Sequence, residues 1–209
     1  MRVGIIQGSS QAQKNSLLYE TVKKYARGHE VINFGCFEHE VHSYSYVEIS
    51  VLIGLLIASC SVDFVVTGCS SGQGMMLACN SMPGVVCGYT PTPKDAYLFA
   101  QINNGNVISL PLGEEYAWSG IVNFEETIEK LFLEPFGQGY PKNEAVRKQR
   151  DTEKSKEIRT LSQISTVDLM KKMDREMVKA IMKKENVVYF VLDNGRNPKI
   201  SDWIKSDIL

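Results

Sequence analysis

Five short apolar segments recur along the first 112 residues of the chain, and segments with helical spacing separate them. The apolar segments comprise residues 3–6, 30–35, 63–66, 85–89 and 107–112. Strands that alternate with helices in this way are typical of a parallel sheet whose two faces are both covered by helices. The sequence therefore predicts an α/β protein with a three-layer α-β-α, Rossmann-like fold around a five-stranded parallel sheet.

The composition changes after Pro141, and this change indicates a second structural unit. From residue 142 to residue 184 the chain is rich in charged residues, and its apolar residues recur at helical spacing. We expect an α/β domain over residues 1–140 and a mainly helical C-terminal extension over residues 141–209, packed on the domain or on a partner subunit. Within the extension, residues 187–191 could form a short edge strand or a docking segment.

Charge and hydropathy argue against two classes of partner. The net charge is −1, so the chain has no excess of basic residues to attract nucleic acid or an anionic membrane. Its longest apolar run, residues 47–58, contains Glu48 and is too short to cross a bilayer. This run predicts a helix that is buried in the core.

Cysteine and histidine usage indicates a reduced, cytoplasmic protein. The five cysteines form no Cys-x-x-Cys pair, and an odd number of them does not suit a disulfide framework. The chain starts with a strand and shows no basic segment followed by an apolar leader. His39 and His42 lie in one loop without a third residue at the spacing of a metal site. We therefore expect no metal and no cofactor.

Asn123 is expected to begin a helix. Its side chain could cap the helix N-terminus, and Glu126, three residues later, completes the pattern of a capping box. The helix would then run to Leu133.

The segment from Thr67 to Met76 is the strongest candidate for chemistry. It places Cys69 at the carboxyl end of a predicted strand and leads through small residues into a predicted helix. Small residues allow a sharp turn and leave backbone N–H groups free to bind an anion, and a helix N-terminus favours a nearby thiolate. A tight turn around a buried, inert cysteine is the alternative interpretation.

Three well-known loops of similar composition do not fit this segment. A phosphatase loop needs an arginine where Met75 stands, and a P-loop needs Gly-Lys-Ser/Thr in place of Gly74-Met75-Met76. The dinucleotide-binding Gly-x-Gly-x-x-Gly pattern has Leu77 at its third glycine.

Other polar residues are expected near the same edge of the sheet. Loops that follow parallel strands meet at the carboxyl edge, where ligands of such sheets bind. Tyr44, in one of these loops, and Tyr46, just beyond it, could orient a substrate hydroxyl or pack beneath the loop. Past Pro141, Arg147 and Arg150 belong to a basic cluster that could bind an anion or form a solvated helix face.

Two blocks of the sequence resemble the type B ribose-5-phosphate isomerases and the galactose-6-phosphate isomerase subunits. The run from Cys69 to Met75, followed by Ala78-Cys79-Asn80, matches that family's Cys-Gly-Thr-Gly-x-Gly-Met/Ile loop and its continuation to Ala-x-Asn. The run from Ile102 to Val107 matches its His-Asn-Asn-x-Asn-Val block before the fifth strand. Both blocks are in register and in the same order.

The resemblance implies an aldose–ketose isomerase that acts on a pentose, tetrose or hexose phosphate through a cis-enediolate. Cys69 would be the base that moves a proton between C1 and C2, and the backbone amides of the loop would stabilise the oxyanion. Ser71 keeps the hydroxyl of the family's threonine. Asn103 and Asn106 match positions that line the family's site, often across a dimer interface, so a homodimer or a dimer of dimers is expected.

The predicted site residues form four groups. They are Cys69 and Ser71 for catalysis; Ser70, Gly72, Gln73 and Gly74 for the oxyanion loop; Ser9, Ser10, Tyr44, Tyr46, Asn103 and Asn106 for substrate binding; and Arg147 and Arg150 for phosphate binding.

The sequence also departs from the family pattern. Gly8-Ser9 replaces the family's Asp-His, Ile102 replaces its ring-opening histidine, and the two arginines only loosely match its phosphate-binding block. These departures predict a substrate that needs little or no ring opening, such as a tetrose phosphate. Two other classes of function are a sugar-phosphate binding or sensing protein that has lost catalysis, and an interaction module that uses the charged extension.

Overall fold

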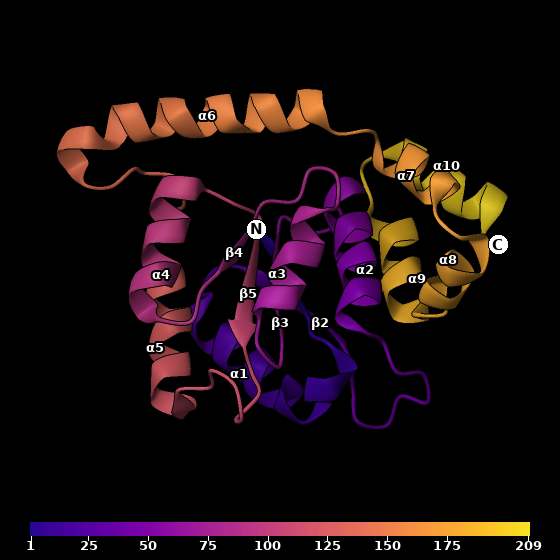
Figure 1. Ribbon diagram of the computed structural model, residues 1–209, viewed down its shortest axis with the longest axis horizontal. Helices are drawn as coiled ribbons and strands as arrows, with labels where there is room; N and C mark the ends of the chain where they lie inside the picture. The colour runs from indigo at the N-terminus through magenta and orange to yellow at the C-terminus, as the bar shows by residue number, and fades with distance from the viewer.

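A parallel sheet of five strands forms the centre of the computed structural model, which describes residues 1–209 (Figure 1). The strands lie in the order β2-β1-β3-β5-β4 and comprise β1 (Arg2–Ile6), β2 (Glu30–Gly35), β3 (Phe64–Cys69), β4 (Cys87–Tyr89) and β5 (Val107–Pro111). Every neighbouring pair of strands is parallel. The predicted α/β fold with a five-stranded parallel sheet is therefore confirmed.

Helices cover both faces of this sheet. They are α1 (Asn15–Tyr25), α2 (Tyr46–Ala58), α3 (Gln73–Asn80), α4 (Pro93–Leu98) and α5 (Gly120–Leu131), with a 3-10 turn at Ser9–Lys14 and a π turn at Phe99–Asn103. Side chains of α2 and α3 share one buried cluster with Val65 of β3. Side chains of α1, α4 and α5 share another cluster with Phe64 and Val66. Successive side chains of β3 thus point to opposite faces of the sheet, and helices cover both faces. The strand therefore needs consecutive apolar residues.

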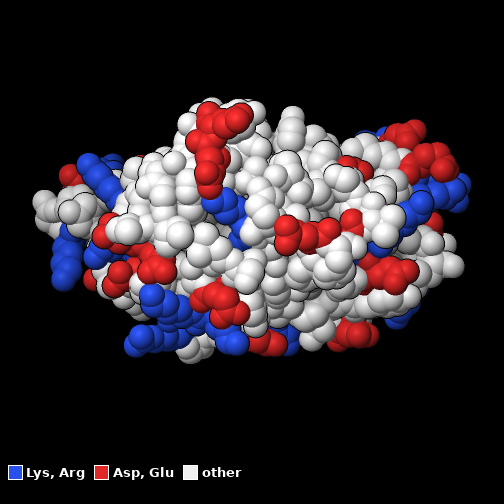
Figure 2. All heavy atoms as spheres, turned by 90° about the horizontal axis from the view of Figure 1, so that it is seen from below, with Lys and Arg blue, Asp and Glu red and all other residues white.

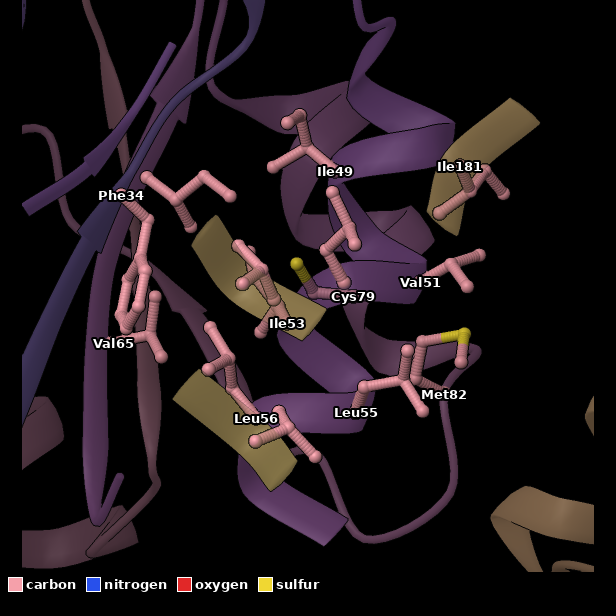
Figure 3. Packing of buried hydrophobic residues seen from close by; sticks show 14 of the residues in the cluster. Phe34, Ile49, Val51, Ile53, Leu55, Leu56, Val65, Cys79, Met82 and Ile181 are labelled. Carbon is pink, nitrogen blue, oxygen red and sulfur yellow. The ribbon is translucent and has the colours of Figure 1, made fainter. Parts of the chain in front are cut away.

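The longest apolar run forms α2, a helix whose central part is buried on all sides. Ser45 and Glu48 close its N-terminus with a capping box. Every residue from Ile49 to Leu56 is buried. Figure 3 shows the reason, since Phe34 and other sheet residues flank the helix on one side and Ile181 of the C-terminal extension flanks it on the other. None of the helices combines the length and the apolar character that crossing a membrane would require.

The C-terminal part of the chain is helical throughout. After a 3-10 turn at Lys142–Glu144 it forms α6 (Ala145–Ser162), α7 (Thr166–Lys172), α8 (Arg175–Met182), α9 (Glu185–Asn194) and α10 (Pro198–Asp207). Helices α7 to α10 pack on the outer side of α2 and extend its buried cluster. They form an additional layer beside the sheet (Figure 1).

Helix α6 is different, because none of its residues is buried. It runs across the amino-terminal edge of the sheet, at the end away from the strand arrowheads in Figure 1. The Thr152 hydroxyl donates to Ile102 O at 2.6 Å, and Arg159 donates to Val85 O at 2.9 Å. Side-chain hydrogen bonds, not apolar packing, therefore hold this helix to the sheet.

The prediction that Asn123 caps a helix is wrong. Helix α5 begins at Gly120, and Asn123 lies within its first turns. The side chain of Asn123 instead donates to Pro91 O at 2.9 Å. The side-chain amide of Asn123 thus bonds to a residue that is distant in the sequence, and it does not cap the helix as the local sequence pattern predicted.

The strand alternative for residues 187–191 is also wrong. These residues lie in α9, where Val187, Val188 and Val191 are buried and Tyr189 is exposed. A strand would have placed residues 187, 189 and 191 on one face, whereas a helix groups 187, 188 and 191. The segment packs on the α2 cluster, as the docking alternative stated.

Candidate active site

The loops that follow β1, β2 and β3 meet at the carboxyl edge of the sheet. β1 lies between β2 and β3, so the chain order reverses there, and parallel sheets bind ligands at such a position. Gly8 N–H donates to Gly68 O at 3.0 Å, which joins the first loop to the third. Ser9 N–H donates to Tyr44 O at 3.0 Å, and Tyr44 N–H donates to Ser9 Oγ at 2.7 Å, which joins the first loop to the second.

Figure 2 shows the molecule from this edge. Acidic and basic side chains are interspersed there among uncharged ones, without a continuous basic surface. An anionic ligand at this edge therefore depends on local donors.

Cys69 ends β3 at the junction of these loops. The residue is 8% exposed. A methyl group on Gly8 would lie 3.8 Å from Cys69 Cβ, so the first loop passes directly beside this side chain. Leu112 N–H donates to Cys69 O at 3.0 Å, which fixes the cysteine backbone to the segment after β5.

The backbone N–H groups that follow Cys69 have no partners. From Ser70 to Met75, none of them donates a backbone hydrogen bond within the protein. They belong to a loop and to the first turn of α3, where a helix leaves its N–H groups unpaired. Together with the helix dipole, these groups favour a negative charge beside Cys69. Ser70, Gly72, Gln73 and Gly74, the residues of the predicted oxyanion loop, lie in this segment.

Gly72 makes the turn from this loop into α3. Its φ is +75°, in the left-handed region, and its carbonyl accepts a hydrogen bond from the Ser109 hydroxyl at 2.6 Å. A Cβ at this position would lie 2.8 Å from the Leu110 backbone and 2.8 Å from Tyr89 Cε2. Both the backbone conformation and the close approach require glycine.

The predicted substrate-binding residues of the first two loops have different environments. Tyr44 is buried, and burial, with a smaller contribution from the Glu40 carboxylate, raises the pKa of its hydroxyl to about 12. Tyr46 is 45% exposed, and its ring lies beside Gly74 at the start of α3. Ser9 is half-buried and Ser10 is exposed. Tyr44 therefore joins two loops through its backbone, whereas Tyr46 and Ser10 are open to solvent.

Two further residues lie at this edge that the sequence did not single out. Gln11 is nearly buried, donates from Nε2 to Ser70 Oγ at 3.1 Å, and leaves its Oε1 without a partner. Tyr89 ends β4 beside Gly72. Burial raises the pKa of the Tyr89 hydroxyl, with Asp95 and Cys69 adding to the effect and a hydrogen bond with Gln73 opposing it. The sequence could have indicated Gln11 and Tyr89, because both lie at or shortly after the carboxyl end of a predicted strand.

Asn103 and Asn106 lie at the opposite, amino-terminal edge of the sheet. Asn106 directly precedes β5, and its side chain donates to Gly84 O at 2.9 Å and accepts from Val86 N–H at 2.8 Å. Asn103 is exposed at the end of the π turn. Neither side chain shares an edge of the sheet with Cys69 in the same chain.

Arg147 and Arg150 lie on α6, beside the same amino-terminal edge. Arg147 pairs with Glu144 and Asp151, and Arg150 pairs with Asp151. A hollow of about 670 Å³ separates α6 from the sheet. Its lining includes Asn104, Asn106, Lys156, Arg159, Phe64 and Phe136. The predicted site residues thus form two groups, one at each edge.

The structure does not arrange three or more histidine, cysteine, aspartate or glutamate side chains in a way that could hold a metal ion.

The sequence matches the family described as Ribose/Galactose Isomerase over residues 3–154. No curated protein matches the sequence significantly. Among solved structures, the chain is similar to a 4-deoxy-L-threo-5-hexosulose-uronate ketol-isomerase complexed with a tartrate, with 38% identity and a TM-score of 0.92. That similarity covers 99% of this chain and 98% of the other.

The chain is also similar to two other solved structures. A ribose-5-phosphate isomerase from Vibrio parahaemolyticus has 33% identity and a TM-score of 0.89, with 100% of this chain and 99% of that chain covered. A type B ribose 5-phosphate isomerase from Trypanosoma cruzi has 24% identity and a TM-score of 0.63, with 76% of this chain and 98% of that chain covered. The last similarity shows the shared fold, and about a quarter of this chain lies outside it.

Proposed function

The chain belongs to the ribose/galactose isomerase family, and we propose that it interconverts the aldose and ketose forms of an open-chain sugar with an anionic end, in the first place a sugar phosphate. The observation that carries this proposal is Cys69 at a junction of three loops, followed by a run of unpartnered N–H groups. Removal of a proton next to a carbonyl needs a base and preorganised donors for the developing oxyanion, and this arrangement supplies both.

In the proposed reaction the Cys69 thiolate removes the proton from C2 of the aldose. The electrons of that C–H bond form the C1–C2 double bond of a cis-enediolate, and the loop N–H groups stabilise the charge on O1. The Ser71 hydroxyl passes the proton of O2 to O1. The Cys69 thiol then protonates C1 and yields the ketose, so that all atoms and electrons remain within the sugar and the thiol.

The sequence and the loop packing support an open-chain substrate. Ile102 occupies the position of the family's ring-opening histidine. His39 stacks on Phe37 with 5.5 Å between ring centres, and His42 packs against Tyr44 at 4.5 Å. The histidines of the second loop are thus engaged with that loop itself.

A uronate is the second candidate substrate. The solved structure with 38% identity is named for a 4-deoxy-5-hexosulose uronate, a compound without hydroxyls on C4 and C5, the groups that close aldose rings. A carboxylate would then take the place of the phosphate. The two candidates share the proposed chemistry and the open chain and differ only in the anionic end.

A substrate panel in deuterated water tests this proposal. The panel contains D-erythrose 4-phosphate, D-ribose 5-phosphate, D-galactose 6-phosphate and a 4-deoxy-5-hexosulose uronate, and proton NMR follows both isomerisation and deuterium uptake at C1 and C2. We expect turnover of the erythrose phosphate or the uronate in preference to the ring-forming phosphates. Turnover confined to ring-forming phosphates would refute the open-chain proposal. Tight binding without deuterium uptake would indicate a sensing protein.

We also propose that two chains share each site. Asn103 belongs to the opposite edge of the sheet from Cys69, and so do Arg147 and Arg150 on α6. In a two-fold symmetric dimer, this edge of one subunit can face the carboxyl edge of the other. The hollow beneath α6 offers room for such an approach. A homodimer would thus unite the two groups of predicted residues.

Complementation between subunits tests the shared site. We expect Cys69→Ala and Asn103→Ala each to be inactive, whereas mixed dimers, refolded from equal amounts of both, regain about a quarter of the wild-type activity because half of the dimers carry one intact site. Size-exclusion chromatography establishes the dimer. A mixture as inactive as its parents would contradict the shared site but not the isomerase.

A further inference from the structure

The second rim loop, residues 36–45 between β2 and α2, has little structure of its own. Val41 at its tip is fully exposed, and the loop forms neither helix nor strand. Gln7 Nε2 donates to Cys36 O at 2.7 Å at the start of the loop, and two hydrogen bonds between Tyr44 and Ser9 connect its end to the candidate site. A loop of this kind needs contacts from elsewhere in the fold to hold one conformation.

Lys184, from the turn between α8 and α9, supplies such contacts. It is 4% exposed and pairs with Glu40, at the middle of the second rim loop. Its ammonium group also lies 5.4 Å from the ring centre of Phe37 and 5.7 Å from that of Tyr44. One cation thus contacts the start, the middle and the end of the loop.

Glu40 connects the Lys184 ammonium group to the backbone of the loop. Its Oε1 accepts the Phe37 N–H at 3.1 Å as well as the Lys184 ammonium. A methyl group on Gly35 would lie 2.6 Å from the same oxygen, so the carboxylate is folded tightly against the end of β2. Loss of the lysine would leave a largely desolvated carboxylate without its counter-ion, and the loop would have to open to hydrate it.

A short series of contacts connects Lys184 to the reacting cysteine. Lys184 faces Tyr44, and Tyr44 exchanges two hydrogen bonds with Ser9. The residue before Ser9 is Gly8, which bonds to Gly68 O and passes beside Cys69. The C-terminal extension thereby reaches the candidate active site from outside.

We propose that Lys184 is a positioning residue of the isomerase site, and that its ion pair with Glu40 holds the second rim loop closed against Ser9. The inference rests on the proposed function. Lys184 lies beyond residue 154, where the match to the family ends. The extension therefore contributes to the reaction and not only to the stability of the fold.

The extension offers a matched control at the other edge of the sheet. Arg196 also ties the extension to the domain, through Asp63 at 3.2 Å and Cys60 O at 3.1 Å. Asp63 directly precedes β3, whereas Cys69 ends it. Both Lys184→Met and Arg196→Met remove one cation between the same two parts of the chain, but only the first acts on the second rim loop.

We expect Lys184→Met to lower kcat about tenfold or more, because small displacements of site groups have large effects on rate, and to change KM less. Arg196→Met should stay within about twofold of wild type. Lys184→Arg keeps the charge and should retain most of the activity. Glu40→Gln, which removes the pair without shortening a side chain, should lower kcat like Lys184→Met and replaces that variant if it does not fold.

Hydrogen exchange provides a readout that does not depend on activity. The amides of Ser9 and Tyr44 should exchange faster in Lys184→Met and Glu40→Gln than in wild type and in Arg196→Met. Unchanged exchange at these two amides, or equal losses of activity in Lys184→Met and Arg196→Met, would overturn the positioning role. If wild type isomerises no sugar of the panel, the proposed function fails, and the exchange result still decides whether Lys184 closes the loop.

Discussion

Replacement of Cys69 by alanine should lower kcat by a factor on the order of 10² to 10⁴, the usual contribution of a positioned general base. The loop N–H groups from Ser70 to Met75 remain in this variant, so binding of the substrate should change much less than the rate. Deuterium uptake at C1 and C2 should fall in parallel with isomerisation, because both depend on the same proton transfer. Steady-state kinetics and NMR on the substrate from the panel measure these effects.

Two further variants distinguish the loss of the catalytic base from other effects of replacing a cysteine. Cys69→Ser keeps the size of the side chain but offers a far weaker base, and we expect it to resemble Cys69→Ala. Cys60 is an exposed thiol in the turn before β3, at the other edge of the sheet, so Cys60→Ala should retain wild-type activity. Isomerisation that survives in Cys69→Ala would exclude this residue as the base.

Gly72→Ala should destabilise the fold by about 2–4 kcal/mol and abolish most of the activity, since strain and overpacking act together. The residue has a φ of +75°, and a Cβ there would lie 2.8 Å from the backbone of Leu110. Backbone atoms of β5 cannot move away without disturbing the sheet. The loop after Cys69 must therefore shift, and its N–H groups lose their alignment. Chemical denaturation and kcat/KM report the two effects.

Gly84 provides the matched control for this substitution. Its φ of +74° is nearly the same, but a Cβ there would meet nothing within 4 Å. Gly84→Ala should thus show only the cost of the left-handed conformation, about 1–2 kcal/mol, with normal activity. Equal losses of stability in the two variants would show that the close approach at Gly72 has no effect of its own.

The sheet was predictable because its central strands are buried on both faces. Such strands need mostly apolar residues in succession, and residues 64–66 and 107–112, with Ser109 as the only polar residue, show this pattern without reference to any partner. The position of Cys69 followed from the same pattern, since the residue after a buried strand must lie at the edge of the sheet. The edge occupied by Asn106 could have been inferred likewise, because this residue precedes its strand.

Contacts between distant loops were not predictable in this way. The bond from Gln11 to Ser70 and the pairing of Lys184 with Glu40 join residues that are far apart in sequence, and no local pattern links them. The conformation of residues 187–191 was ambiguous for a related reason. Consecutive apolar residues suit a strand or a helix, and packing against α2 decides between them.

The burial of the central part of α2 from all sides has a consequence for biosynthesis. The sheet covers its inner side early, but the helices that cover its outer side are translated only after all five strands. Until α8 to α10 leave the ribosome, a strongly apolar helix surface stays open to solvent and to other nascent chains. We therefore expect the emergence of α8 to α10, and not closure of the sheet, to be the step that removes this apolar surface from contact with chaperones and other nascent chains.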